Sequence, residues 1–376
     1  MSISSVAAVD LRRPAAGALA GPPSPHPSAS PTRRFDTLDA MRGVAAIAVV
    51  TTHAEPFLGG VPLPNGSLAV DLFFLLSGFV LTHAYSERLD ADASAGGFLG
   101  IRLVRLWPLY MVGAVLGSLL FALQLATGAW ELGVAGSVLA VVSLWLMMPS
   151  PIPNRFDEVF LINGPRWSLF YELAVNVLMA VSWKFLRPNR RLIPAVLLLG
   201  VILAATMRHY HTVELGWSSR TLVAGFARVS FPFFAGVLIY RLHGSVQVKS
   251  RAAILLPLLL LPTFAILPHR EVAYALACIL VVFPVLVFLG ARFQPPTPRI
   301  SRMLGELSYP LYIIHVPLLG LAELALRLSG RSPQQGQPYV GILLLAAIIA
   351  LSLVLARKYD PAARRSLAAM VFRARA

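Results

Sequence analysis

Apolar residues in this chain gather in long runs that short polar segments separate. The runs lie near residues 35–57, 67–85, 107–126, 133–149, 165–186, 192–207, 221–240, 253–268, 272–290, 303–328 and 339–356. Most have about the 17 to 25 residues that a helix needs to cross a bilayer. The pattern predicts an all-α fold, a polytopic membrane helix bundle.

The charges that flank these runs predict how many of them cross the membrane. Both ends of the chain are basic, so the positive-inside rule places both on the cytoplasmic side and requires an even number of crossings. The run at 133–148 is short and is followed by the proline-rich loop PSPIP. We therefore expect about ten spanning helices plus one re-entrant or buried segment, with Asn163 outside and Ser245 inside.

Composition excludes the common soluble classes. The chain has 376 residues, of which 57% are hydrophobic and 13% charged, against about 25% charged in soluble domains. The formal charge of +15 comes from cations at the ends of apolar runs, which argues against a nucleic-acid partner. The single cysteine, Cys278, lies in an apolar run and allows no intramolecular disulfide.

Three regions follow from these patterns. Residues 1–34 are rich in Pro, Ala and Ser without apolar periodicity, which predicts a disordered cytoplasmic tail and not a signal peptide. Residues 35–356 form the membrane domain. Residues 357–376 are expected to be a basic cytoplasmic tail, too short to fold as a further domain.

The first apolar run carries two ionisable groups at membrane depth. Arg42 and His53 are eleven residues apart, so on a helix they share a face and stand about 16 Å apart along the axis. An intramembrane cation indicates a functional site by default. The alternative is an arginine that extends to the interface and a histidine that bonds to a neighbouring helix.

Further polar groups interrupt later runs. Asp71 and Glu172 are carboxylates that must be paired, hydrated or protonated at such depth. Arg102 and Arg105 lie one turn apart on one helix face, where they suit phosphate binding or serve only as a positive-inside flank.

The run near residue 310 adds three aromatic polar side chains. Tyr312 and His315 are three residues apart and therefore share a helix face. Tyr309 precedes them, and a core role for the tyrosines is as plausible as a functional one.

Five motifs now stand in one order along the chain. They are Arg42 with ten intervening residues before His53, DLFFLLSGF (71–79), RLVRLWPLY (102–110), WSLFYE (167–172) and SYPLYIIHVP (308–317). In this order the chain resembles the acyltransferase-3 family of integral membrane acyltransferases, which O-acylate saccharides and other acceptors. It departs from the family around WSL, where Phe170, Tyr171 and Leu173 replace a small polar residue and a second acid.

The resemblance implies an acyl-coenzyme A donor, most simply acetyl-coenzyme A, as a substrate and not as a bound cofactor. It implies a saccharide or glycolipid acceptor in the cell envelope or in secreted material. Transfer to a hydroxyl needs a base, and a histidine with a pKa near 6.5 contributes about 10² to 10⁴-fold. We expect His53 to be this base, with Glu172 or Asp71 orienting its ring.

The same resemblance assigns the remaining candidates. Arg42, Arg102 and Arg105 are expected to bind the donor's phosphates. Other site candidates are Trp167, Ser168, Tyr309, Tyr312 and His315. Metal-binding motifs and a nucleophile elbow are absent from the sequence, and Ser77 lacks a supporting motif, so direct transfer is expected.

One other function fits buried Arg, His and Glu residues. A transporter or exporter of a saccharide or lipid-linked saccharide would use them as a proton relay and substrate site. No inverted repeat supports it. Either function implies a multi-pass protein, which we expect in the bacterial cytoplasmic membrane.

Overall fold

The computed structural model describes residues 33–60, 63–91, 95–130, 132–154, 156–244, 246–266 and 271–373. The longer helices are α1 (Asp36–His53), α3 (Ala69–Asp90), α4 (Ala95–Ala126), α5 (Val134–Trp145), α6 (Trp167–Leu186), α7 (Asn189–Tyr210), α8 (Leu222–Leu242), α12 (Phe283–Arg292), α13 (Arg299–Leu328), α14 (Tyr339–Val354) and α15 (Asp360–Arg373). Short elements are α2 (Glu55–Leu58), α9 (Leu255–Leu258), α10 (Leu260–Ala265), α11 (Val272–Ala277), and the strands β1 (Val248–Lys249) and β2 (Phe293–Gln294).

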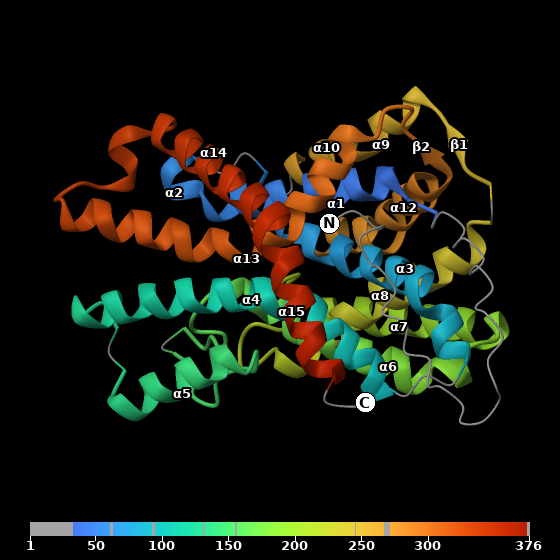
Figure 1. Cartoon of the computed structure of the whole chain (residues 1–376), viewed down its shortest axis with the longest axis horizontal. Helices are drawn as coiled ribbons and strands as arrows, with labels where there is room; N and C mark the ends of the chain where they lie inside the picture. Colours follow the sequence, from blue (N-terminus) through green and yellow to red (C-terminus); the bar gives the residue numbers. More distant parts are fainter. Residues whose placement is uncertain are drawn as a thin grey trace, which may run out of the picture.

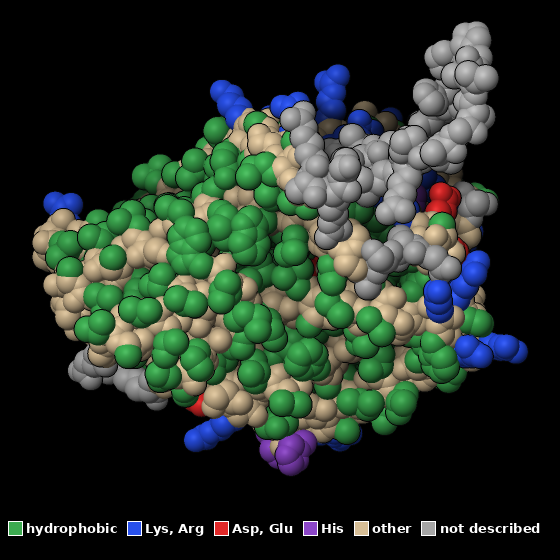
Figure 2. All heavy atoms as spheres, turned by 60° about the horizontal axis from the view of Figure 1, so that its bottom comes forward, with side chains coloured by type: hydrophobic (Ala, Val, Ile, Leu, Met, Phe, Trp, Pro, Cys, Tyr) green, Lys and Arg blue, Asp and Glu red, His purple; other side chains and the backbone are tan. Residues whose placement is uncertain are grey.

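The fold is a polytopic helical membrane bundle, as the hydrophobic pattern predicts. Among the described residues, eight helices are long and apolar enough to cross a membrane. Apolar side chains cover the middle of the face in Figure 2, and Lys and Arg lie toward its margins. Without water, only structures that satisfy their own backbone can span lipid, and helices do so.

Two further elements would complete the expected ten. Helix α1 has 18 residues but carries Asp36, Asp39 and Arg42, and the segment Arg251–Ala265 is a shorter apolar helix. The total of ten spans therefore stays a prediction.

Helices α1, α4 and α13 run in the same direction (Figure 1). Near their starts the Asp36 carboxylate lies 2.9 Å from Arg302 Nε, and farther along the rings of His53 and His315 are 5.0 Å apart. Between α4 and α13, the Tyr309 hydroxyl donates to the Leu106 carbonyl. We call the end at Asp36 the basal end and the end beyond His53 the apical end.

Helices α3, α6 and α8 run the opposite way. His83, late in α3, bonds to the Arg33 carbonyl just before α1, so α3 is antiparallel to α1. Trp183, late in α6, donates to Asp90 at the end of α3. Successive helices that cross a membrane run in opposite directions, and the two groups of helices show this pattern.

Two glycines let α3 and α8 pack in backbone contact. A methyl group on Gly78 would lie 1.9 Å from the Phe233 carbonyl oxygen, and one on Gly236 would lie 2.0 Å from the Leu75 carbonyl oxygen. Small residues at helix interfaces allow this approach in membranes. The packing brings Asp71 of α3 opposite Arg228 of α8.

The segment predicted not to cross is α5. Its 12 residues span about 18 Å, short of a bilayer's roughly 30 Å hydrocarbon core. Because α4 runs toward the apical end and α6 runs away from it, α5 begins and ends at the same end. Arg166 holds it there by donating to the Ser143 and Met148 carbonyls, at 3.2 and 2.6 Å.

The two predicted tails differ in outcome. The N-terminal one lies outside the described residues except for Arg33 and Arg34. Residues 357–373 are helical. A π-helical turn at Leu355–Tyr359 joins α14 to α15. Helix α15 packs against α4, and in Figure 1 the α14–α15 rod crosses the bundle.

The structure bears on how accessible Asn163 is, whereas its side of the membrane stays a prediction. Asn163 is buried, with its side-chain amide donating to the Ile313 carbonyl at 3.1 Å, so a cysteine there would be shielded from an impermeant reagent. Ser245 lies outside the described residues. Exposed Ala129, after α4, and exposed Ala252, after β1, mark the apical and basal ends instead.

The topology predicts that single cysteines at these two positions label differently. In a Cys278→Ser background, Ala129→Cys should react with an impermeant thiol reagent on intact cells, and Ala252→Cys only after the membrane is opened. The reason is that the basal end carries the positive charge that stays cytoplasmic. Labelling of Ala252→Cys on intact cells would reverse the orientation.

Candidate functional site

A cavity of about 110 Å³ opens between α1, α3, α4, α6 and α13. Polar side chains on its wall are Arg42, Ser77, Arg102, Arg105, Ser168, Glu172, Ser308, Tyr309 and Tyr312. The rest of the wall is apolar and includes Phe73, Phe74, Leu106 and Leu169. A mostly apolar cleft with a few convergent polar groups is the usual form of a small-molecule site.

Three arginines from two helices meet at this cavity. Arg102 Nη2 lies 2.9 Å from Glu172 Oε1, and Ser77 Oγ donates to the same oxygen at 2.5 Å. Arg42 interacts electrostatically first with Asp39, one turn earlier on α1, and then with Glu172 and Arg102. The three arginines Arg42, Arg102 and Arg105 outnumber Asp39 and Glu172, the two carboxylates that interact with Arg42, so this end of the cavity is net positive.

A second buried ion pair lies beside the cavity. Arg228 donates to both oxygens of Asp71, at 3.0 and 2.8 Å, and both side chains are nearly fully buried. The Arg228 guanidinium also stacks 5.2 Å from the Trp167 ring centre. Bidentate pairing and stacking both suit arginine, and they explain the position of Trp167, which does not line the cavity.

The expected pairing of His53 with Glu172 or Asp71 is wrong. Glu172 is bound to Arg102 and Ser77, and Asp71 is bound to Arg228. Glu172 also lies at the level of Arg42, about 16 Å along α1 from His53 by helix rise. Each carboxylate pairs with the guanidinium nearest to it, because an unpaired charge is costly at this depth.

His53 instead faces a second histidine. Its Nδ1 bonds to the Val49 carbonyl at 2.9 Å, and its ring stands edge-on to His315. His315 is fully buried, and its Nδ1 bonds to the Leu311 carbonyl at 3.0 Å. Its Nε2 has no hydrogen-bond partner among the described residues. A carbonyl partner at Nδ1 leaves Nε2 of a neutral ring as the basic atom.

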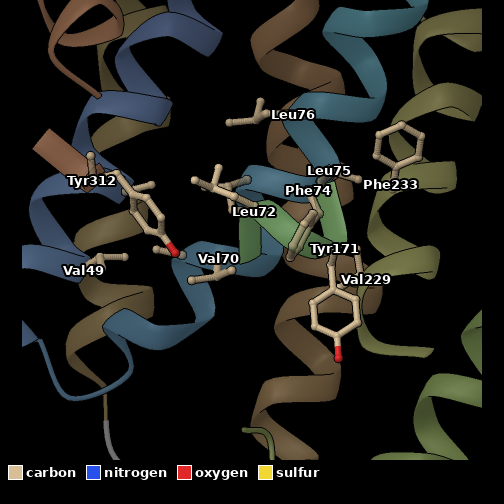
Figure 3. Close-up of a cluster of buried hydrophobic side chains, with 14 of the residues drawn as sticks. Val49, Val70, Leu72, Phe74, Leu75, Leu76, Tyr171, Val229, Phe233 and Tyr312 are labelled. Atoms are coloured by element: carbon tan, nitrogen blue, oxygen red, sulfur yellow. The ribbon is translucent and has the colours of Figure 1, made fainter. Parts of the chain in front are cut away.

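Tyr312 stands between the cavity and the two histidines. It lines the cavity, its ring centre is 5.9 Å from that of His315, and its hydroxyl is 2.7 Å from Ser168 Oγ. Figure 3 shows it in a buried cluster with Val49 and Val70. His53 is exposed at the apical end of α1, and ring contacts through His315 connect it to Tyr312 on the cavity wall.

Two charged residues near the cavity and the histidine pair, Arg228 and Glu214, were not among the site residues expected from the sequence. Arg228 interrupts an apolar run in the same way as Arg42, so the same argument identifies it. Glu214, in the loop before α8, interacts electrostatically with both His53 and Arg228. The local sequence around Glu214 contains no motif that indicates a role, because the loop approaches α1 only in the folded protein.

That loop is tied to the loop after α5. Ser219 and the Arg220 backbone both donate to the Asp157 carboxylate. The Ser219 hydrogen bond, aided by the Arg220 backbone and guanidinium, lowers the pKa of Asp157. The two loops thereby form one apical unit that carries Glu214.

Asp71→Asn should destabilise the bundle strongly. The change leaves the Arg228 charge buried without its partner, which costs about 3 to 5 kcal/mol. Glu306→Gln is the matched control, because its partner Arg357 is more than half exposed and such pairs contribute about 0 to 1 kcal/mol. Thermal unfolding of both variants in detergent measures the difference, and equal midpoints would contradict the structural role of the buried pair.

Two known proteins are similar in sequence to parts of this chain. Protein 2 in the picA locus of Rhizobium radiobacter is 41% identical over 162 residues, which cover 41% of this chain and 84% of that protein. The acyltransferase MdmB of Streptomyces mycarofaciens is 34% identical over 176 residues, 42% of each chain. No solved structure matches the chain.

A family model decides the assignment. The model, described as an acyltransferase domain, matches residues 35–357, which include α1 through α14 and every group of the cavity and the histidine pair. The chain therefore belongs to the acyltransferase-3 family of integral membrane acyltransferases.

Proposed function

We propose that the protein transfers an acyl group, most simply acetyl, from a coenzyme A thioester to a hydroxyl of a saccharide or glycolipid. The donor enters from the basal, cytoplasmic end, and the acceptor approaches the apical end. The protein thereby modifies cell-envelope or secreted material from the cytoplasmic membrane of a bacterium.

The observation that carries the proposal is a cavity whose wall includes three arginines and Tyr312, with His315 and His53 packed in sequence behind Tyr312. Coenzyme A has the matching order of parts: phosphates, a long pantetheine arm and a thioester. Arg42 and Arg105 suit the phosphates, because guanidinium groups bind phosphate oxygens in pairs. The apolar wall suits the arm, whose thioester would then reach the level of His53.

In the proposed reaction, His53 Nε2 takes the proton of the acceptor hydroxyl. The oxygen attacks the thioester carbonyl carbon, the carbon–sulfur bond breaks, and the coenzyme A thiolate leaves with the proton from His53. Glu214 would stabilise the transient imidazolium by its negative charge. The Tyr312 hydroxyl lies on the cavity wall, where it donates to the Pro165 carbonyl at 3.0 Å and is 2.7 Å from Ser168 Oγ; it would stabilise the oxyanion by turning that proton toward it.

Glu172 has a different role in this scheme from the expected one. Paired with Arg102 and Ser77, it fixes one guanidinium on the cavity wall. Because Glu172 is paired with Arg102, the side chains of Arg42 and Arg105 would bind the phosphates of the incoming donor. The role is positional and needs no proton transfer.

His53→Ala should abolish acyl transfer and leave coenzyme A binding intact. The loss removes a base worth about 10² to 10⁴-fold in rate, whereas the phosphate groups bind about 16 Å away along the helix. Transfer from radiolabelled acetyl-coenzyme A, measured on purified protein without an ion gradient, tests this. Near-normal turnover would remove His53 from the mechanism, and saccharide uptake into vesicles without acylation would favour a transporter.

Arg42→Gln combined with Arg105→Gln should weaken coenzyme A binding by about 100-fold or more, because each charge-assisted hydrogen bond to phosphate contributes about 1.5 to 3 kcal/mol. Binding should also lose most of its dependence on salt. Exposed Arg190 supplies the control, and Arg190→Gln should bind normally. Calorimetry measures coenzyme A binding by wild type and both variants. Unchanged binding in the double variant would mean that these arginines only set the orientation of the helices in the membrane.

A further inference from the structure

Helix α15 packs against α4 behind the cavity wall and carries a fourth arginine, Arg364. Arg364 lies on the first turns of α15 and is largely buried, with a side-chain exposure of 17%. The helix is held in place at its start, where the Tyr359 hydroxyl donates to the Pro108 carbonyl of α4. Asp360 is 3% exposed and lies 2.6 Å from Arg364.

Arg364 joins the arginines of the cavity electrostatically. It interacts with Arg102 and with Tyr309, both on the cavity wall. Arg105 interacts with Arg102, Arg42 and Arg364. The cavity-wall arginines therefore continue outward through Arg105 to α15.

Several buried polar atoms near this cluster lack hydrogen-bond partners among the described residues; besides Asp360 Oδ1, they include two donors. These donors are Nε of Arg102 and the hydroxyl of Tyr85, and Tyr85 interacts electrostatically with Arg105. Buried polar atoms without partners are rare and indicate an absent ligand or water. The four arginines outnumber the three carboxylates Asp39, Glu172 and Asp360 that interact with them, so the cluster is net positive and attracts an anion.

We propose that Arg364, with Arg105 and the Tyr85 hydroxyl, forms a subsite for the 3′-phosphate of the donor's ribose. This inference rests on the proposed function. The pantetheine arm must run inward toward Tyr312, so the pyrophosphate meets Arg42 and the inner arginines. The 3′-phosphate is farther from the thioester than the pyrophosphate is, and Arg364 is the cation beyond Arg105 on the path outward.

A purely structural role for Arg364 makes a different prediction. In that case its only task is to neutralise Asp360, and its loss would affect stability and the binding of every coenzyme A analogue alike. A phosphate subsite would instead distinguish coenzyme A from 3′-dephospho-coenzyme A. The presence of that single phosphate therefore separates the two roles.

The experiment measures the dissociation constants of coenzyme A and 3′-dephospho-coenzyme A by calorimetry on the purified full chain. Wild type should prefer coenzyme A by roughly tenfold or more. Asp360→Asn combined with Arg364→Gln, which avoids a buried unpaired carboxylate, should lose this preference while binding the dephospho analogue like wild type. Asp360→Asn alone should keep it, as should Arg365→Gln on the exposed side of α15.

The outcomes separate the two proposals. If wild type binds both ligands equally, or if the double variant retains the preference, the subsite is wrong and the proposed function stands. If wild type binds neither ligand, the proposed function fails together with the subsite. Arg364→Lys, which keeps the charge, serves if the double variant does not fold, and it should retain part of the preference.

Discussion

The structure depends on neutralising charge inside a bundle whose surroundings offer no water. Two ion pairs do this, Arg102 with Glu172 and Arg228 with Asp71, and they join α4 to α6 and α8 to α3. Desolvating such groups costs several kcal/mol each, so a charge left without its partner is strongly destabilising. The pairs therefore restrict which helices can be neighbours at this depth.

The same pairing divides the remaining polar groups between two places. With Glu172 and Asp71 occupied, Arg42 interacts with Asp39 and Arg105 adds a further cation at the cavity, and among the described residues the two histidines have no direct carboxylate contact. Positive charge therefore gathers toward the basal end and neutral bases toward the apical end. A donor that is anionic at one end and reactive at the other fits this division.

Close packing makes this arrangement rigid. Gly78 and Gly236 allow α3 and α8 to touch through their backbones, which fixes Ser77 against Glu172 beside them. Arg166 anchors the short helix α5 near the apical end. A site on such helices keeps its geometry better than one on mobile loops.

The sequence alone determined the helical membrane fold, the family and most of the groups at the site, because hydrophobic run length and intramembrane charge are local properties. It also identified α5 as too short to cross. Only the tertiary structure decided which charges pair. Arg228, in sequence far from Asp71, takes the carboxylate expected for His53, and Glu214 approaches His53 on a loop. Helix α15 likewise meets α4, which carries the cavity arginines, only through packing, because contacts between distant segments depend on how helices assemble and not on local pattern.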